Sequence, residues 1–271
     1  MKQELKQKYP IWCADQEFGK FDTVLGDDID TLLGCSLLKA IKGYNINWFY
    51  DFHDMFGINL TNCKEPIGVD MALVKHKCWD NHLTMMSASD YFNPQSANIN
   101  NIKKNHRGHY GNKYAGSTLL QIWSYYDIPL PQSERGKAIL LAVDVAFKGH
   151  YHKRFNYIHN HYLRELGFEE LIDVLNRHTM DEMYKVIHAY NLHGKIRINE
   201  NGILQTNINL AELQGFFDFD ISLPTDEFQH VRAYKRKGED IVGKKTYDMD
   251  KIFSFALTAQ DHVSFTEKII L

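Results

Sequence analysis

The sequence predicts an α/β fold: a mainly parallel sheet flanked by helices, followed by a smaller C-terminal α+β domain. Two observations support this prediction. In the first half of the chain, short apolar segments that end near aspartate or histidine alternate with helical patterns, as expected for parallel strands joined by helices. In the last third, alternating β-type residues surround Asn201-Gly202 and residues 259–261, which indicates two hairpins.

The segment at residues 21–38, FDTVLGDDIDTLLGCSLL, predicts a strand, an acidic turn and a helix. The helix should end at Gly43, because glycine is a common C-terminal cap. The turn contains Asp27, Asp28 and Asp30. These carboxylates repel one another unless a positive group lies between them, and a divalent cation is the usual one. Alternatively, Asp27 and Asp28 only cap the helix.

Three further apolar segments end in the same way. NINWFY leads to Asp51, PIGV leads to Asp70, and KHKCW leads to Asp80, Asn81 and His82. In open α/β sheets, ligands bind at the carboxyl ends of the strands. We therefore expect these side chains to converge, although they are far apart in the sequence.

Residues 90–114 are polar and predict a long loop, which in a compact domain is usually functional or disordered. Its basic side chains are suited to holding substrate phosphates, or they form a solvated surface; they are Lys103, Lys104, His106, Arg107, His109 and Lys113. Helices are predicted at residues 115–126 and 135–141, and an apolar segment then ends at Asp144.

Residues 152–191 have helical periodicity. We place a domain boundary near this point, which gives domains at residues 1–158 and 159–271. The C-terminal domain would serve as a substrate or cap domain. Its basic run at residues 232–237, RAYKRK, either extends a substrate groove or is solvated surface.

Composition excludes several classes of protein. The chain has 271 residues, 44% of them apolar, and a formal net charge of −3, which argues against a protein that holds long nucleic acid by bulk electrostatics. It has neither a signal-peptide pattern nor an apolar run that could span a bilayer, so a cytoplasmic location without membrane attachment is expected. The four cysteines form no C-x-x-C pair and are expected to be free thiols.

With these segments in order, residues 20–150 resemble the DHH phosphoesterase superfamily, which includes RecJ-like exonucleases and nano-RNases. The resemblance lies first in Asp28-Ile29-Asp30, Val69-Asp70 and Asp80-Asn81-His82. It continues in Asn93-Pro94 with the helix entry at residues 114–118, and in Asp144 followed by Phe147, where the resemblance implies an aspartate after an apolar strand. The motif Asp80-Asn81-His82 departs from the family, because Asn81 stands where the first histidine of D-H-H is commonly a metal ligand. In many relatives a histidine also precedes D-x-D by four residues, where this chain has Val24.

The residues themselves supply four carboxylates and one imidazole: Asp28, Asp30, Asp70, Asp144 and His82. This set can hold two divalent ions, and its hard oxygen ligands suit Mn²⁺ or Mg²⁺ better than Zn²⁺. Asp80 and His82 are the catalytic candidates, as a ligand with its orienting partner or as a proton donor to the leaving oxygen. The candidates for substrate binding are Asn81, His106, Arg107, His109 and Lys113.

The function predicted from these residues and from the resemblance is a metal-dependent phosphoesterase, a hydrolase acting on a nucleotide or a short single-stranded oligonucleotide. One alternative is a nucleotide-binding module that has the same fold and weakened catalysis. Another is a pyrophosphate or polyphosphate hydrolase. The sequence allows a homodimer but does not require one.

Overall fold

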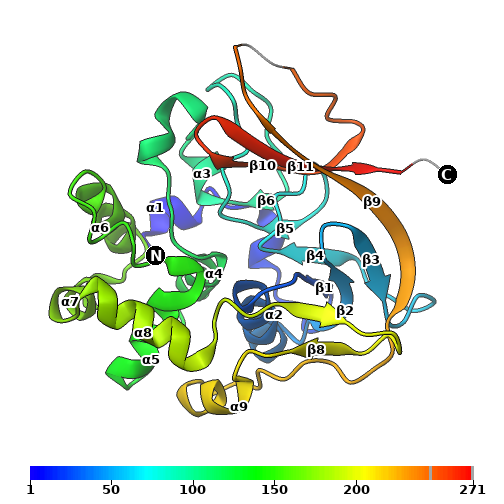
Figure 1. Ribbon diagram of the computed structural model, residues 1–271, viewed down its shortest axis with the longest axis horizontal. Coiled ribbons are helices and arrows are strands. Elements are labelled where there is room, and N and C mark those ends of the chain that lie inside the picture. The colour runs from blue at the N-terminus through cyan, green and yellow to red at the C-terminus, as the bar shows by residue number, and fades with distance from the viewer. Residues whose placement is uncertain (244–245, 270–271) are drawn as a thin grey trace.

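The computed structural model describes residues 1–243 and 246–269. Its largest feature is a nine-stranded sheet, whose strands run in the spatial order β10-β11-β9-β3-β2-β1-β4-β5-β6 (Figure 1). The strands are β1 (Asp22–Leu25), β2 (Asn45–Tyr50), β3 (Asp54–Gly57), β4 (Pro66–Val69), β5 (Cys78–Trp79), β6 (Ser96–Ala97), β9 (Gln229–Asp240), β10 (Ile252–Ala259) and β11 (His262–Lys268).

One half of the sheet is parallel. β1 lies between β2 and β4, and β5 and β6 continue outward from β4, all in the same direction. Helix α2 (Ile29–Lys42) follows β1 and ends at Gly43, whose φ is 69°. A Cβ at Gly34 would lie 2.7 Å from Cγ1 of Val69, so glycine allows the helix to pack closely on the sheet. The predicted α/β class and the C-terminal glycine cap are confirmed.

The other half of the sheet is antiparallel. β3 forms a hairpin with β2, and β9 joins β3 to β11 and β10. Figure 1 shows β9 as a long curved strand. The sheet curls so far that β10 bonds back to the segments after β4 and β5: Val74 N donates to Phe253 O at 3.0 Å, and Leu257 N donates to Leu83 O at 2.8 Å. These bonds cover an edge that would otherwise be open to another chain.

Both faces of the central strand are buried. Leu25 packs in the main core between sheet and helices, whereas Val24 packs with Tyr50 and Tyr234 on the opposite face, inside the curl. This follows from the alternation of side chains along a strand. Val24, four residues before Asp28, is therefore a core residue.

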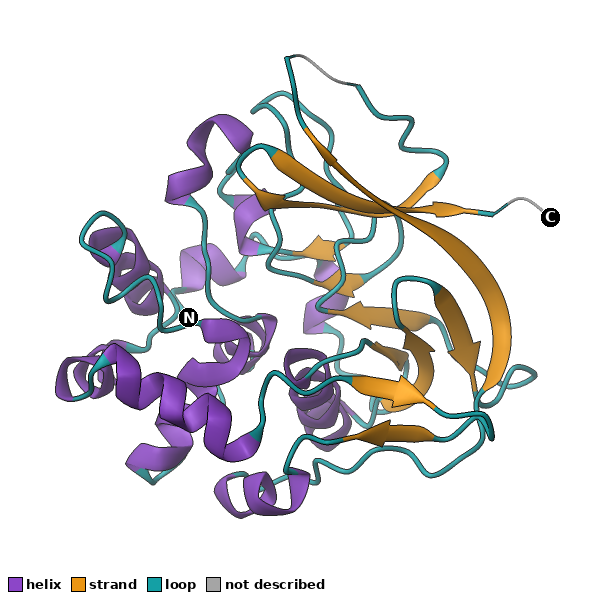
Figure 2. Cartoon of the chain, in the orientation of Figure 1, coloured by secondary structure: helices purple, strands orange, loops and turns teal. Residues whose placement is uncertain are grey.

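Most helices lie together on one side of the molecule, with the strands on the other (Figure 2). The predicted helices are confirmed as α4 (Thr118–Tyr125), α5 (Glu134–Ala142), α6 (Asn156–Glu165), α7 (Glu169–Arg177) and α8 (Met180–Tyr190). The predicted hairpin at Asn201-Gly202 is also present, as β7 (Ile196–Ile198) and β8 (Leu204–Thr206). Two short helices are also labelled in Figure 1, α1 (Gln3–Lys6) and α9 (Leu210–Leu213).

Two predictions of local structure are wrong. Residues 90–114 are not one loop, because they contain β6, helix α3 (Ile99–Ile102) and a 3₁₀ helix (Arg107–Asn112), all too short to show a period in the sequence. Asp144 does not follow a strand; it lies in a 3₁₀ turn (Val143–Val145) directly after α5. An apolar run of this length cannot distinguish a buried strand from a buried helix.

The predicted boundary at residues 158/159 would fall inside α6. The strands on its C-terminal side continue the sheet formed on its N-terminal side, so the division into two domains stays a prediction. Among residues 1–243 and 246–269, no helix is long and apolar enough to cross a bilayer.

Candidate functional site

The carboxyl ends of the parallel strands carry the acidic residues that the sequence singles out. Asp70 and Asp80 directly follow β4 and β5, and Asp28 is the N-cap of α2 just beyond β1. The Asp28 side chain accepts a hydrogen bond from Thr31 N at 3.2 Å. Asp28 therefore caps α2, and the same carboxylate also lies close enough to Asp70 for the two charges to repel, so that its role as a metal ligand stays a prediction.

Asp30 connects this cluster to helix α4. Its two carboxylate oxygens accept hydrogen bonds from the backbone N–H groups of Thr118 and Leu119, each at 2.8 Å. The Thr118 hydroxyl donates to Asp70 Oδ1 at 2.6 Å. The N-terminus of α4 therefore orients two of the predicted metal ligands, and a helix N-terminus stabilises nearby negative charge. Thr118 was not predicted from the sequence.

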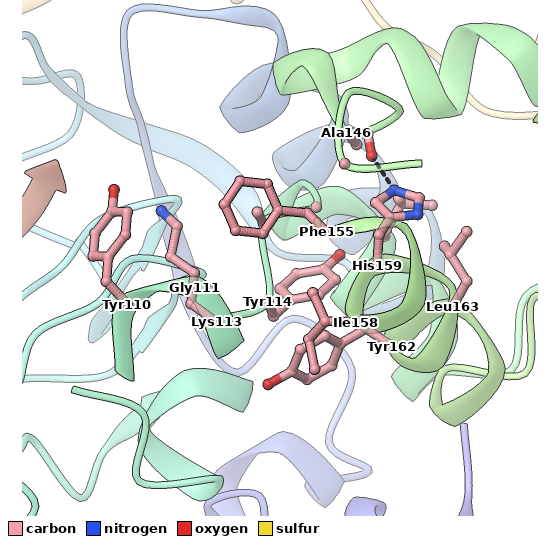
Figure 3. A pocket seen from close by; sticks show the side chains of 14 residues that line it. Tyr110, Gly111, Lys113, Tyr114, Ala146, Phe155, Ile158, His159, Tyr162 and Leu163 are labelled. Atoms are coloured by element: carbon pink, nitrogen blue, oxygen red, sulfur yellow. Dashed lines mark hydrogen bonds between the residues drawn. The ribbon is translucent and has the colours of Figure 1, made fainter. Parts of the chain in front are cut away.

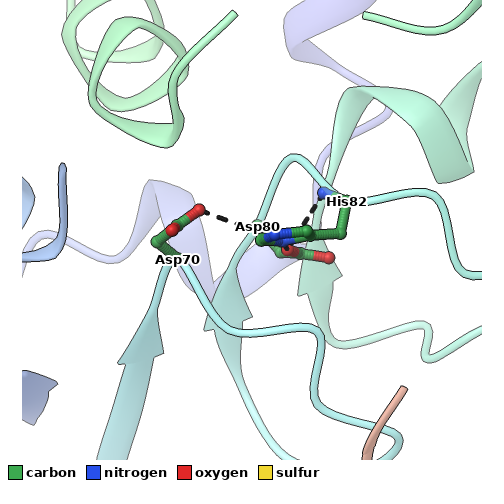
Figure 4. A group of neighbouring side chains, drawn as sticks. All are labelled: Asp70, Asp80 and His82. Atoms are coloured by element: carbon green, nitrogen blue, oxygen red, sulfur yellow. Dashed lines mark hydrogen bonds and ion pairs between the residues drawn. The ribbon is translucent and has the colours of Figure 1, made fainter. Parts of the chain in front are cut away.

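Asp80 and His82 form a hydrogen-bonded pair (Figure 4). Asp80 Oδ1 lies 2.7 Å from His82 Nδ1, and Asp80 Oδ2 accepts a hydrogen bond from Asn98 Nδ2 at 2.6 Å. Because a carboxylate only accepts, Nδ1 must carry the proton, which leaves Nε2 to a metal ion or to a proton in transfer. His82 Nδ1 also lies 4.0 Å from Asp70 Oδ1. One ligand atom from each of Asp70, Asp80 and His82 fits within a mutual distance of 4.8 Å.

The electrostatics of the cluster are those of crowded like charges. Burial, reinforced by neighbouring carboxylates, raises the pKa of Asp28 and Asp70 to about 6. Burial and the charges of Asp70 and Asp144 also raise the pKa of Asp30 well above its usual range. Burial lowers the pKa of His82, but Asp80, Asp70 and Asp144 outweigh this and raise it to about 10. A cation at this position would relieve the repulsion.

Asp144 reaches the same site from a different part of the chain. Together with Asp28 and Asp30 it lines a cavity of about 160 Å³, whose wall also includes His193 and Lys195. The backbone of Asp144 is left-handed, with φ of 51°, as is that of Asp70, with φ of 55°. Non-glycine residues are uncommon in this region, which often marks functional sites.

Lys195 was not predicted from the sequence. Its Nζ lies 3.0 Å from Asp27 Oδ1 and 3.9 Å from Asp28 Oδ2, and the backbone bond from Ile196 N to Asp27 O, at 2.8 Å, holds the segment in place. The only signal is the short polar sequence His193-Gly194-Lys195. Nothing in it shows that β7 begins beside the acidic turn.

The five predicted substrate-binding residues separate in space. Asn81 donates to Gly116 O at 2.6 Å, and Asn81 and Lys113 both lie close enough to Asp144 to favour its charged form. Arg107 instead reaches the antiparallel half of the sheet, where Nη2 donates to Asp261 Oδ1 at 2.7 Å and to Ile241 O at 3.1 Å.

The remaining two predicted substrate-binding residues, His106 and His109, contact each other, with ring centroids 4.5 Å apart. His106 Nδ1 also accepts a hydrogen bond from Gly108 N at 3.2 Å. Their role in binding substrate stays a prediction.

Comparison with known proteins adds nothing to this geometry: no family model, curated protein or solved structure matches the chain. The arrangement itself is a dense group of carboxylates with one oriented imidazole, bordered by two lysines. Such a group can bind divalent cations and hold a phosphate beside them.

Proposed function

We propose that this protein is a divalent-metal-dependent phosphoesterase that hydrolyses a nucleotide or a short single-stranded oligonucleotide, as the resemblance to the DHH superfamily implies. One observation carries the proposal: Asp28, Asp70, Asp80, His82 and Asp144, from separate segments, form one cluster, which is buried or half-buried except for the exposed Asp144. The folded chain has brought together charges that repel, and such an arrangement is typical of functional sites.

The donor set fits a metal ion. It contains four carboxylates and an imidazole whose Nδ1 proton is held by Asp80, and such hard ligation favours Mn²⁺ or Mg²⁺. Asp28, Asp70, Asp144 and His82 are the residues that would hold the metal, in the expected stoichiometry of two ions per chain. When bound, the ions lower the pKa of a water molecule and offset charge on the phosphoryl group.

The chain's own residues have distinct roles in this proposal. Asp80 fixes the tautomer and direction of His82, and Thr118 fixes Asp70. Lys113 lies near Asp144 and Lys195 near Asp28, where their ammonium groups attract a substrate phosphate as point charges. His82, if it does not bind metal, is placed to donate a proton to the leaving oxygen.

The test is hydrolysis by purified protein with Mn²⁺ and a panel of dinucleotides, cyclic dinucleotides, 3′,5′-bisphosphonucleotides, short single strands and pyrophosphate. We expect turnover of a nucleotide substrate, and Asp70→Asn should lower kcat/KM by at least about a hundredfold. Absence of turnover across the panel, or equal turnover by Asp70→Asn, would overturn the proposal.

Asp51→Asn is the matched control. Asp51 follows the neighbouring strand β2, but its Oδ1 accepts hydrogen bonds from His53 N and Asp54 N in a turn, at 2.9 and 2.7 Å. Asparagine can accept the same bonds, so this variant should keep its activity. Turnover of pyrophosphate alone would favour the polyphosphate alternative, and tight nucleotide binding without turnover would favour the binding module.

A further inference from the structure

A second cavity borders the carboxylate cluster. It has a volume of about 120 Å³ and lies between the segment before α4 and helix α6. Figure 3 shows that its walls are largely aromatic and aliphatic, with Tyr114, Phe155, Ile158, His159 and Tyr162 around it. An apolar cavity of roughly 150 Å³ binds benzene, so this somewhat smaller cavity is on the scale of one aromatic ring.

The cavity and the carboxylate cluster share part of their walls. Lys113 lines the cavity and also acts on the charge of Asp144. Gly116, another wall residue, accepts the hydrogen bond from Asn81. Ala146 lies two residues beyond Asp144 and is also in the wall. A ring in the cavity would therefore lie next to the position proposed for the substrate phosphate.

Three polar side chains of the wall already have partners. Tyr114 Oη donates to Ser117 O and Tyr162 Oη to Asn112 O, each at 2.9 Å. His159 Nε2 lies 2.7 Å from Ala146 O, to which it donates. These groups hold the wall in shape and are not free to read the edge of a ligand. A ring would be bound by stacking and apolar contact, which tolerate different bases.

We propose that this cavity binds the nucleobase of the substrate, with little preference among bases, while the phosphate lies at the carboxylate cluster. The inference rests on the proposed function for the phosphate position. It specifies the substrate class, since a ringless phosphate or a polyphosphate would leave the cavity unused.

The experiment measures binding of adenosine and uridine without added metal, and hydrolysis of a dinucleotide with Mn²⁺. Ile158→Trp fills the cavity. Tyr157→Trp adds the same ring one position away, where the side chain is 78% exposed, and serves as the control. We expect both nucleosides to bind the native protein with affinities within about threefold, since stacking does not read base edges. Ile158→Trp should weaken both by at least about tenfold, as expected for a loss of 1–3 kcal/mol.

The outcomes separate the two proposals. Nucleoside binding that Ile158→Trp abolishes and Tyr157→Trp preserves supports the base site, even if no dinucleotide is hydrolysed. Dinucleotide hydrolysis without nucleoside binding, or binding that Ile158→Trp leaves unchanged, overturns the base site and leaves the phosphoesterase proposal standing. If Ile158→Trp does not fold, as judged by its melting curve, Phe155→Ala removes an aromatic wall instead and should weaken binding in the same direction.

Discussion

The two halves of the nine-stranded sheet differ in where their strands deliver polar residues. In the parallel half, residues after β1, β4 and β5 meet at one edge and form the acidic cluster. In the antiparallel half, strand ends alternate between edges, and the side chains form apolar clusters inside the curl. The exposed basic residues Lys235 and Arg236 of β9 lie on this half. Parallel pairing gathers distant residues into a site, whereas the antiparallel half contributes backbone hydrogen bonds from β10 to the segments after β4 and β5.

The largest expected effect is a loss of activity on substitution of Asp80, at the acidic edge of the parallel half. Asp80→Asn should lower kcat by about a hundredfold, because an asparagine lacks the negative charge that holds the Nδ1 proton and the ring of His82 in place. The pH dependence of kcat should shift to lower pH, since the loss of the Asp80 charge removes the main interaction that raises the pKa of His82. The measurements are a pH–rate profile and an NMR titration of the imidazole. An unchanged profile would show that the pair has no part in the reaction.

A smaller effect is expected on the stability of the metal-free protein. The pKa values of Asp28 and Asp70 are raised to about 6 in the folded chain, so the folded state binds more protons than the unfolded state between about pH 4 and 6. This contribution to stability is present at low pH and is lost as the pH rises through 6. Protein treated with a chelator should therefore melt a few degrees higher at pH 5 than at pH 7.5.

The control for that measurement is the double variant Asp28→Asn and Asp70→Asn. Its melting temperatures at pH 5 and pH 7.5 should differ by less than those of the native protein. If the native protein and the double variant showed the same difference in melting temperature, the pH dependence would come from other groups. The antiparallel half should not contribute to the stabilisation at low pH. Among the residues that the structure describes, it contains no comparable group of carboxylates.

The smallest effect concerns Arg107, which connects the 3₁₀ helix to the antiparallel half through Asp261 and Ile241. Arg107→Ala should lower the free energy of unfolding by about 1 kcal/mol, or the melting temperature by roughly 2–4 °C, with kcat/KM changed less than about twofold. Lys113→Ala is the comparison and should raise KM with little change in stability. The reverse result would support the predicted role of Arg107 in binding substrate.

The sequence was most informative where one residue type had one physical role. Gly43 marks a helix end and Gly202, after Asn201, marks a hairpin turn, because both glycines have the left-handed backbone that glycine adopts without steric cost. Aspartates after apolar strands marked the edge where Asp70 and Asp80 lie. These signals are local, and the structure has them where they were expected.

Other features depend on contacts that no local pattern encodes. Lys195 lies next to Asp27 only because β7 starts there, and Thr118 matters only because α4 points its N-terminus at Asp30. Arg107 shows the opposite case: its setting in a basic segment suggested a ligand, but tertiary structure supplies Asp261 as a partner. The assignment of a strand before Asp144 failed because a short buried run has no period to distinguish the two structures.

The left-handed backbone of Asp70 and Asp144 has a consequence for mutagenesis. Aspartate, asparagine and glycine tolerate this conformation, whereas branched side chains clash with the neighbouring carbonyl group. A saturation library at either position would then be filtered twice, first by whether the polypeptide can adopt the turn and then by whether the new group can replace a carboxylate. Survivors enriched in asparagine and glycine but devoid of turnover would show the two filters acting separately.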